Sequence, residues 1–354
     1  MFDAVVAGGG PAGAAVASRL AGRGYAVVLL ERGRYGQPRP GETLAPEVRP
    51  LLAGLAVWER FQQSGPVPSW ETRSAWGGPP TTASHLVNPY GSGWHVDRAA
   101  FDRLLVDSAA SAGADVRLGV SASHYQFADD GWEVTTSAGP VRGRVLVDAT
   151  GRRAAAARAL GAHRLPFDRL VGLAATVPEV NTSAQGYLLV ETAADGWWYT
   201  APVPGGELVG VLMTDADLSR AGRLAHPSAW RARLAGAPAT AERLAGRTTS
   251  VPKVFPAASH RLQRGSDARP WLAVGDAALA VDPISGTGVV RALRRAEAAA
   301  DAVEGLLRSR DAADHAAADY EAALDVECTE YLTRRAAYYR LERRYASLFW
   351  ARRS

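Results

Sequence analysis

The feature that most constrains this chain is a glycine-rich turn close to its first residue. A short apolar run at residues 4–7 leads into the turn, Gly8 to Gly13 with the sequence GGGPAG, and a helix-like run follows at residues 14–22. The spacing G-x-G-x-x-G between a strand and a helix is typical of a dinucleotide-binding domain. Gly8 allows the tight turn, Gly10 lets the backbone approach a pyrophosphate, and Gly13 lets helix and strand pack closely.

The residues after this turn predict where an adenosine lies. A second apolar run at residues 25–30 ends at Glu31, about twenty residues beyond the glycines. An acidic side chain at this position accepts hydrogen bonds from a ribose hydroxyl, while the N-terminus of the first helix faces the phosphates. These features suit NAD and FAD equally. They predict a doubly wound α/β domain with a bound dinucleotide and leave the kind of dinucleotide open.

The composition argues against several other classes of site. Cys328 is the only cysteine among the 354 residues, so neither an intramolecular disulfide nor a cysteine-based metal site is possible, and no pair of histidines has metal-ligand spacing. A net charge of +4 does not argue for nucleic-acid binding. No apolar run approaches the roughly 20 residues that span a bilayer, and the first residues lack the basic segment of a signal peptide. We therefore expect a cytoplasmic protein without a transmembrane segment.

Four later segments resemble one family and select FAD. The stretch Pro38–Leu44 resembles the P-x-x-G-E-[ST]-L segment of the flavin-dependent halogenase and monooxygenase superfamily. Val96–Asp102 is similar to its V-D-R-x-x-F-D element, and Val147–Arg152 to its D-A-[ST]-G turn. The strongest match is Trp271–Leu293, WLAVGDAALAVDPISGTGVVRAL. Together these motifs indicate a tryptophan halogenase-like FAD-dependent oxidoreductase, related also to geranylgeranyl reductases.

The resemblance extends to the C-terminal residues. Tyr338–Arg343 and Phe349–Arg353 look like the tail of halogenase-like flavin monooxygenases, including those that mature quinone-cofactor enzymes. The last 24 residues contain seven arginines and one glutamate. We expect these arginines to pair with acidic residues of the FAD domain or to remain in water, with docking of an acidic partner or contact with a membrane as alternatives.

The cofactor implied by the resemblance is FAD, and the motifs imply which residues hold it. We expect Asp276 to reach the ribityl hydroxyls, and the backbone N–H groups of Gly286, Thr287 and Gly288 to face the pyrimidine end of the isoalloxazine. The complete set of expected cofactor-binding residues is Gly8, Gly10, Pro11, Ala12, Gly13, Glu31, Arg32, Arg39, Glu42, Thr43, Arg98, Asp148, Gly151, Gly275, Asp276, Pro283, Gly286, Thr287 and Gly288. No metal site is expected.

The implied fold is α/β, with a doubly wound FAD-binding domain of the GR2 type, like that of p-hydroxybenzoate hydroxylase, and an inserted antiparallel substrate domain. The FAD-binding domain is expected over residues 1–60, 94–160 and 265–305, and the substrate domain over 61–93 and 161–264, followed by a C-terminal helical segment at 306–354. Strand signals at residues 171–177, 186–191, 197–202 and 208–214 predict an antiparallel sheet that covers the flavin. Residues 291–354 have an almost continuous helical pattern.

The chemistry of the flavin stays open between several alternatives, because one scaffold supports many reactions. Hydroxylation of an electron-rich aromatic substrate, through a flavin C4a-hydroperoxide protected from water, requires least of the protein and is the function we expect. Halogenases of the family use a lysine between the glycine turn and the V-D-R element, an interval that holds no lysine here. The remaining alternatives are a halogenase, a double-bond reductase like the geranylgeranyl reductases, and a flavin-binding protein without turnover.

Four residues are candidates for a catalytic role. The halogenase motif W-x-W-x-I-P corresponds here to residues 197–202, WWYTAP, which makes Trp197 and Trp198 candidate pocket walls. Lys253 is the only lysine in the chain. His95 precedes the V-D-R element by one residue and is a candidate base for the ring proton, although a packing or capping histidine is the interpretation that we favour.

The expected partners follow from this chemistry. The substrate is an aromatic small molecule, an aromatic side chain of a peptide, or a group bound to a carrier protein. The sequence contains no second strand–G-x-G-x-x-G–helix unit, so no separate NAD(P)H domain is expected. The family resemblance favours a separate NAD(P)H-dependent flavin reductase as the source of electrons, and no nucleic acid is expected as a partner.

Overall fold

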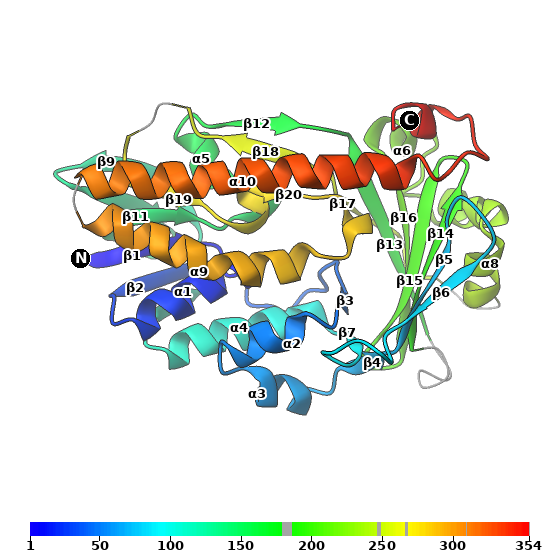
Figure 1. Cartoon of the computed structure of the whole chain (residues 1–354), viewed down its shortest axis with the longest axis horizontal. Coiled ribbons are helices and arrows are strands. Elements are labelled where there is room, and N and C mark those ends of the chain that lie inside the picture. Colours follow the sequence, from blue (N-terminus) through cyan, green and yellow to red (C-terminus); the bar gives the residue numbers. More distant parts are fainter. Residues whose placement is uncertain (179–185, 246–248, 266–267, 309, 354) are drawn as a thin grey trace.

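The computed structural model describes residues 1–178, 186–245, 249–265, 268–308 and 310–353. Two bodies lie side by side along the long axis of the molecule (Figure 1). One contains the N-terminal glycine turn and is called the nucleotide-binding body. The other is built on a twisted sheet and is called the roof.

The nucleotide-binding body is centred on a seven-stranded sheet with the order β8-β2-β1-β11-β10-β9, to which β19 adds along β11. Its parallel strands are β1 (Phe2–Ala7), β2 (Val27–Glu31), β8 (Asp115–Leu118), β11 (Gly139–Asp148) and β19 (Trp271–Ala273), and an antiparallel pair, β9 (Ala122–Ala128) and β10 (Gly131–Thr136), extends it. β2 is buried at every position, as expected for a parallel strand covered on both faces. Helix α1 (Pro11–Gly22) lies between α4 (Arg98–Ser111) and α9 (Gly288–Leu307).

The roof is a second seven-stranded sheet with the order β17-β13-β16-β15-β14-β5-β6. Its strands are β13 (Leu170–Pro178), β14 (Tyr187–Ala193), β15 (Gly196–Val203) and β16 (Glu207–Asp215), with β17 (Lys253–Pro256) at one edge and β5 (Glu71–Ala75) and β6 (Thr81–Ser84) at the other. β13, β15 and β16 contain three of the predicted runs and extend each by one residue at both ends, whereas β14 starts one residue later than its predicted run and ends two residues later. β5 was not expected as a roof strand, and it pairs with β14 in parallel although all other roof pairs are antiparallel.

The two faces of the roof sheet pack against different parts of the chain. The inner face carries Trp197, Val209 and Val211 and packs against the tail and against Ile284 of the nucleotide-binding body. The outer face carries Trp198 and Leu212 and is covered by α7 (Pro227–Ala232) and α8 (Pro238–Leu244). Leu218 of α6 (Ala216–Ala221) packs with the inner-face cluster instead. Alternation along each strand, with a period of two residues, produces this division.

Two small sheets and three short helices lie outside the two large sheets, and the helices pack on the core of the nucleotide-binding body. One sheet has the order β3-β7-β4, with β3 (Thr43–Leu44), β7 (Gly93–His95) and β4 (Val67–Ser69). The other has the order β12-β18-β20, with β12 (His163–Pro166), β18 (His260–Gln263) and β20 (Leu279–Ala280). Helices α2 (Val48–Ala53) and α3 (Trp58–Gln63) lie near α4, and α5 (Ala155–Ala159) follows β11.

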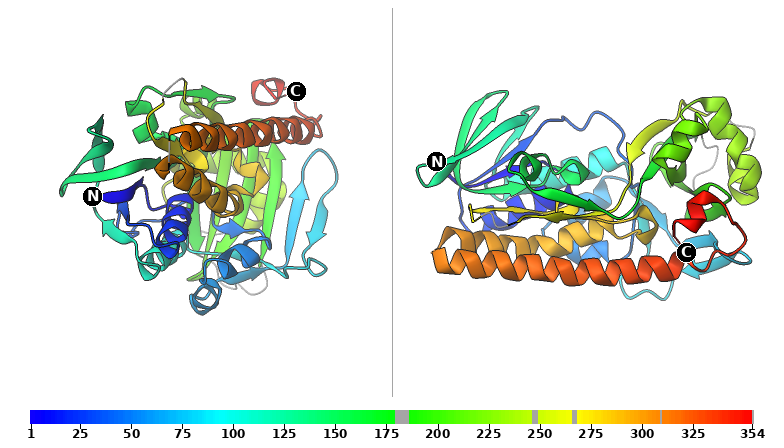
Figure 2. Two further views of the ribbon diagram at one scale, coloured as in Figure 1. Left: turned by 60° about the vertical axis from the view of Figure 1, so that its left-hand side comes forward. Right: turned by 90° about the horizontal axis from the view of Figure 1, so that it is seen from above.

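The C-terminal segment runs along the whole molecule. Helix α10 (Arg310–Tyr339) starts beside α9 at the far end of the nucleotide-binding body and ends at the roof (Figures 1 and 2). The continuous helical pattern predicted the segment only in part, because the helix ends at Tyr339 and only the short α11 (Leu348–Ala351) follows. Phe349 and Trp350 of α11 are buried against the inner face of the roof. None of the helices that the structure describes is long and apolar enough to cross a membrane.

Candidate active site

The glycine turn joins β1 to α1 with the geometry that the sequence predicts. Gly8 has φ +114°, and a Cβ added there would lie 2.3 Å from the carbonyl oxygen of Ala149, so only glycine fits. A Cβ on Gly13 would lie 2.0 Å from Gly8 O, because helix and strand touch at this point. Gly10, by contrast, has nothing within 4 Å of its Cβ position and caps α1 without a side-chain hydrogen bond. The turn therefore leaves free space and free N–H groups at the helix N-terminus, where phosphate groups bind.

Glu31 lies beside this turn at the end of β2. Its Oε2 accepts from the Gly9 N–H at 2.8 Å and its Oε1 from the Gly33 N–H at 2.7 Å. Arg39 approaches Oε1 at 3.4 Å and pairs with Asp102 at 3.0 Å. The carboxylate is thus held at the edge of the glycine turn, where a ribose is expected. Arg32, the next residue, is exposed.

The Pro38–Leu44 loop is fixed against the start of α4. Arg98 donates to the carbonyl oxygens of Pro40, at 2.8 Å, and Gly41, at 3.2 Å. It also pairs with Asp102, one turn further along the helix, at 3.1 Å. Asp97 caps the same helix by accepting from its first N–H groups. The loop and the V-D-R element, distant in sequence, therefore form one unit.

Asp148 shapes the turn after β11 and has little capacity left for a ligand. Its Oδ1 accepts from the Thr150 N–H and hydroxyl at 2.8 and 2.7 Å, and its Oδ2 accepts from the Ala157 N–H at 2.7 Å. The side chain is fully buried, and burial raises its pKa. The carboxylate therefore holds the turn in which Gly151 has a positive φ of +65°.

The Gly275–Asp276 turn meets the glycine turn. Gly275 has φ +58°, and its Cβ position lies 2.6 Å from the Cβ of Ala12, at the start of α1 where Pro11 is the first residue. Asp276 pairs with Arg152 at 3.3 Å, and its side chain remains 34% exposed. Both expected FAD-binding motifs thus meet, and the Asp276 carboxylate is open to a ligand.

The N-terminus of α9 completes a cradle. Pro283 opens a 3₁₀ turn, Pro283–Ser285, and Gly286 with φ +60° ends it. Cβ positions on Gly286 and Gly288 have nothing within 4 Å, and Thr287 gives α9 no side-chain cap. Gly10, Gly286 and Gly288 therefore have open space at their Cβ positions, whereas Gly8 and Gly13 are tightly packed. The residues therefore fit FAD, and we expect its pyrophosphate at α1, its ribityl chain at Asp276 and its ring at residues 286–288.

Two side chains of β15 connect the roof to the two sides of this cradle. Trp197 Nε1 donates to the Tyr339 hydroxyl at 3.0 Å, and that hydroxyl donates to Asp282 Oδ2 at 2.7 Å. The Tyr199 hydroxyl donates to Glu42 Oε2 at 3.2 Å. Burial raises the pKa of the Glu42 carboxyl, and burial together with the Glu42 charge raises the pKa of the Tyr199 phenol. β15 therefore passes over the expected position of the isoalloxazine.

The alternation of side chains along β15 shows which of its residues correspond to the halogenase motif. Trp197, Tyr199 and Ala201 share the inner face, so Tyr199 and not Trp198 takes the place of the second tryptophan in W-x-W-x-I-P. Trp198 points to the outer face, where its ring lies 4.9 Å from that of Trp230. The structure does not bring Trp197 and Trp198 to one pocket, because neighbouring residues of a strand face opposite sides.

The remaining catalytic candidates, His95 and Lys253, lie on strands of two different sheets. His95 on β7 is fully buried, its Nδ1 is 3.0 Å from the Thr43 hydroxyl, and burial together with the charge of Arg243 lowers its pKa to about 3. A neutral imidazole of this kind is a weak base. Lys253 lies exposed on the edge strand β17, opposite Ala174 of the inner face.

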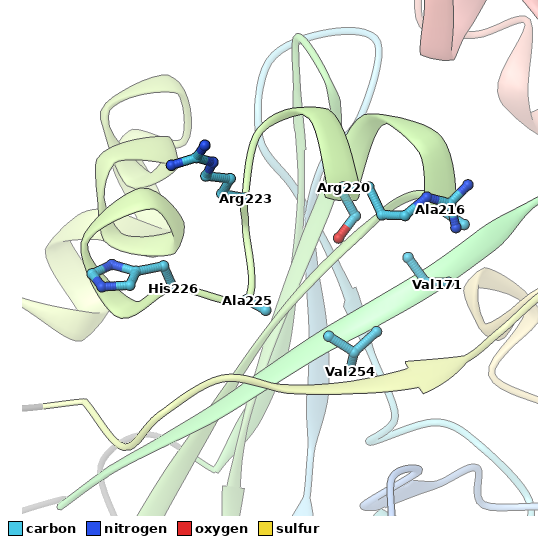
Figure 3. A pocket seen from close by; sticks show the side chains of 8 residues that line it. Val171, Ala216, Arg220, Arg223, Ala225, His226 and Val254 are labelled. Carbon is cyan, nitrogen blue, oxygen red and sulfur yellow. The ribbon is translucent and has the colours of Figure 1, made fainter.

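A cavity of about 370 Å³ lies on the outer face of the roof. Val171 and Val254 of neighbouring strands form its floor, and Arg220, Arg223 and His226 flank it (Figure 3). None of the expected flavin residues lines it, so it is separate from the cradle. Within the described ranges, the His, Cys, Asp and Glu side chains form no cluster that suits a metal ion.

Sequence reasoning missed three of the residues that tie the roof to the cradle. Tyr199 lies inside the motif at residues 197–202, and Asp282 lies inside the match Trp271–Leu293, but a hydrogen bond between the roof and the cradle was predicted for neither. Tyr339 was noted in the tail motif without a role. The alternation of β15 and the four-residue spacing of Tyr331, Arg335 and Tyr339 are the signals that point to them.

Comparison with known proteins agrees with this geometry. A family model described as tryptophan halogenase matches residues 70–354. The chain is 32% identical to a putative FAD-dependent oxidoreductase, LodB of Marinomonas mediterranea, over 99% of this chain and 96% of the relative. It is 25% identical to the myxobacterial chondrochloren halogenase CndH, over 100% and 86% of the two chains, with a TM-score of 0.89. The structure of QhpG, a peptidyl tryptophan dihydroxylase, is matched at 27% identity over 99% and 78%, with a TM-score of 0.79.

Proposed function

Because this chain belongs to the tryptophan halogenase family and is an FAD-dependent oxidoreductase, we propose that it is a monooxygenase that hydroxylates an electron-rich aromatic substrate. When bound and reduced, FAD supplies two electrons and activates O2 for transfer of one oxygen atom, while the other oxygen leaves as water. The protein binds the ring, orients the substrate, excludes water and accepts a proton.

The observation that carries this proposal is the position of the only lysine. Halogenases of the family need a lysine that intercepts hypohalous acid between the flavin and the substrate. Here Lys253 is exposed on an edge strand, and the interval from Gly13 to Val96 contains no lysine. A hydroxylase needs no such group, because the substrate reacts beside the flavin itself.

The inner face of β15 supports the same proposal. Tyr199 replaces a tryptophan and Ala201 replaces an isoleucine of the halogenase motif, and both changes reduce the side-chain volume above the cradle. A smaller barrier lets an aromatic substrate approach the flavin more closely. Direct oxygen transfer requires such an approach, whereas halogenation by a diffusing reagent does not.

We further propose that Glu42 accepts the proton released from the substrate ring. A base improves in strength as its pKa rises towards the working pH. Burial raises the pKa of the Glu42 carboxyl, and its side chain is 8% exposed beside Tyr199. His95 is less suited, because its pKa is lowered to about 3.

The form of the substrate is proposed from the relatives. QhpG is named as a peptidyl tryptophan dihydroxylase, and its likeness covers 99% of this chain. We therefore choose an indole side chain within a peptide as the first substrate, with free tryptophan and a carrier-bound aromatic group as alternatives. A separate NAD(P)H-dependent flavin reductase is the proposed electron donor, and the cytoplasm, where NAD(P)H is available, is the proposed compartment.

The test is a single turnover with labelled oxygen. FAD-loaded protein is reduced chemically without oxygen, then mixed with ¹⁸O2 and a tryptophan-containing peptide, in the presence and absence of bromide. We expect a product that carries ¹⁸O and no bromine under both conditions. A brominated product without ¹⁸O would instead establish the halogenase, which the family model and the likeness to CndH favour. Reduction of an isoprenoid double bond without oxygen would establish the reductase.

A further inference from the structure

Three side chains at successive turns of α10 meet at one aspartate of the nucleotide-binding body, two at its carboxylate and one at its backbone N–H. Tyr331, Arg335 and Tyr339 are four residues apart and therefore share one face of the helix. The Tyr339 hydroxyl donates to Asp282 Oδ2 at 2.7 Å, and Arg335 Nε lies 3.4 Å from the same oxygen. The Tyr331 hydroxyl accepts from the Asp282 N–H at 2.8 Å. We call these four residues the Asp282 cluster.

Asp282 stands at the start of the loop that is expected to hold the isoalloxazine. Its side chain is fully buried, and its Oδ1 accepts from the Ile284 N–H at 3.0 Å, which shapes the turn. The loop at residues 283–288 follows directly and contains the open glycines of the cradle. A shift of Asp282 therefore moves the backbone that faces the ring.

The Asp282 cluster also reaches the roof and the connection that leads into it. Trp197 donates to the Tyr339 hydroxyl at 3.0 Å, so one hydroxyl joins β15 to Asp282. Arg335 pairs with Asp168 at 3.0 Å, and Asp168 lies between β12 and β13. The flavin loop, the roof and α10 thus share one buried network.

Apolar packing would hold these segments together at a lower desolvation cost. Arg335, Asp168 and Asp282 have side chains that are 12%, 5% and 0% exposed, and burying such charges is unfavourable unless they are paired. A buried polar network in which every member has a partner instead favours one arrangement of the segments that it joins. The geometry here selects one position of the flavin loop.

We propose that the Asp282 cluster positions the flavin loop, so that Tyr331, Arg335 and Tyr339 tune the affinity and the reduction potential of bound FAD without touching it. Arg335 supplies the charge that offsets Asp282 next to the loop. All four act through the backbone of residues 283–288 and are positioning residues. The inference rests on FAD binding and is independent of hydroxylation.

The test compares Tyr339→Phe with Tyr338→Phe. Each change removes one hydroxyl near the end of α10, but the Tyr338 hydroxyl bonds to Ser74 and not to Asp282. In Tyr339→Phe both Trp197 and Asp282 lose a partner, and we expect the Kd for oxidised FAD to rise about tenfold. Reduced FAD carries more negative charge, so its Kd should rise by a further factor of about ten compared with that of oxidised FAD. This difference lowers the two-electron midpoint potential of bound FAD by about 30 mV.

The readouts are fluorescence titration of the apo-protein with FAD, dye-equilibrated potentiometry, and circular dichroism as a check of folding. Tyr338→Phe is expected to keep the wild-type Kd and potential. Arg335→Lys keeps the positive charge but loses the forked geometry of the guanidinium. The Kd of this variant for FAD should therefore rise, while the midpoint potential of the bound FAD stays near the wild-type value. This variant provides the test should Tyr339→Phe not fold.

The proposal is overturned if folded Tyr339→Phe binds FAD with the wild-type Kd and potential. A lower melting temperature with an unchanged Kd would also overturn it, because it would limit Tyr339 to packing. These readouts involve neither oxygen nor substrate. A failure of the monooxygenase proposal would therefore leave them unaffected.

Discussion

Gly8 and Gly10 belong to the same turn, but only Gly8 is tightly packed. Substitutions at the two positions should therefore affect folding and cofactor binding separately. A side chain on Gly8 would collide with Ala149 O and would adopt φ +114°, so we expect Gly8→Val to prevent folding. Gly10 has φ −74° and open space at its Cβ position, so Gly10→Val should fold and fail to bind FAD. Circular dichroism and FAD titration of the two purified apo-proteins measure the difference. Stoichiometric FAD in Gly10→Val would refute the placement of the pyrophosphate.

Glu42 provides a test in which activity and stability change in opposite directions. The base must be ionised, so turnover should fall as the pH falls through the raised pKa of Glu42. We expect Glu42→Gln to lower turnover about 100-fold or more. A carboxyl whose pKa is raised by folding stabilises the protein at low pH and less so once the pH exceeds that pKa. Glu42→Gln should therefore raise the melting temperature of the apo-protein at neutral pH.

The control for this prediction is Glu47→Gln, five residues further along and half-buried on the surface of the same segment. It should keep both turnover and melting temperature. If Glu42→Gln retains wild-type turnover with an unchanged pH profile, Glu42 is not the base.

For single residues, the sequence predicted positions that depend on backbone conformation better than positions that depend on side-chain contacts. The requirement for glycine at positions 8 and 13 follows from local geometry that a motif records directly. The hydrogen-bond partners of a carboxylate do not follow from local geometry, because they come from other parts of the chain. Asp148 is expected to contact the cofactor, and the sequence did not indicate that its oxygens also accept from Thr150 and Ala157, which only the folded turn brings to it.

The elements of the roof predict that its two faces respond differently to mutation. Trp198→Ala removes a fully buried ring from the outer face, next to Trp230, and we expect it to lower the free energy of unfolding by about 3–5 kcal/mol. The inner face keeps all its contacts with the cradle. The FAD affinity of the folded protein should therefore stay within about twofold of the wild-type value, because the change in stability is not transmitted to the site. Urea unfolding followed by FAD titration below the transition measures both quantities.

A loss of FAD affinity as large as that in Tyr339→Phe would contradict this division of the roof. Trp230→Ala is the matched variant, since its ring belongs to the same outer cluster and its Nε1 donates to Leu173 O at 3.0 Å. It should lower stability similarly and leave FAD binding unchanged.

Elements with a clear local period were predicted well, and elements that depend on distant partners were not. The central roof strands alternate, so their existence and type follow from the sequence. β5 is short and half-buried, and only β14, more than one hundred residues later, makes it part of the roof. The partners of the tail arginines were predicted in part, since Arg335 pairs with Asp282 of the nucleotide-binding body, whereas Arg352 and Arg353 pair with Asp215 of the roof at 2.7 and 2.6 Å.

For the whole molecule, we expect the two bodies to unfold as one unit. The inner face of the roof packs on the tail and on Ile284, and α10 contacts both bodies. Thermal unfolding should therefore show one transition, with the same midpoint by tryptophan fluorescence and by far-ultraviolet circular dichroism. Added FAD should move both signals together, by about 4 kcal/mol at one thousand times its Kd. Two separated midpoints would show that the roof unfolds independently.

The chain connects the two bodies several times, and this has a mechanical consequence. The crossings lie at residues 69–71, 84–93, 166–170, 256–260 and 339–348, and they are spread across the sheet rather than aligned. A domain that swings open needs its links along a single axis. The roof is instead attached to the nucleotide-binding body at several places around the sheet. If the roof does not swing open, we expect the rate of substrate entry to depend on the size of the incoming group more than on any domain motion.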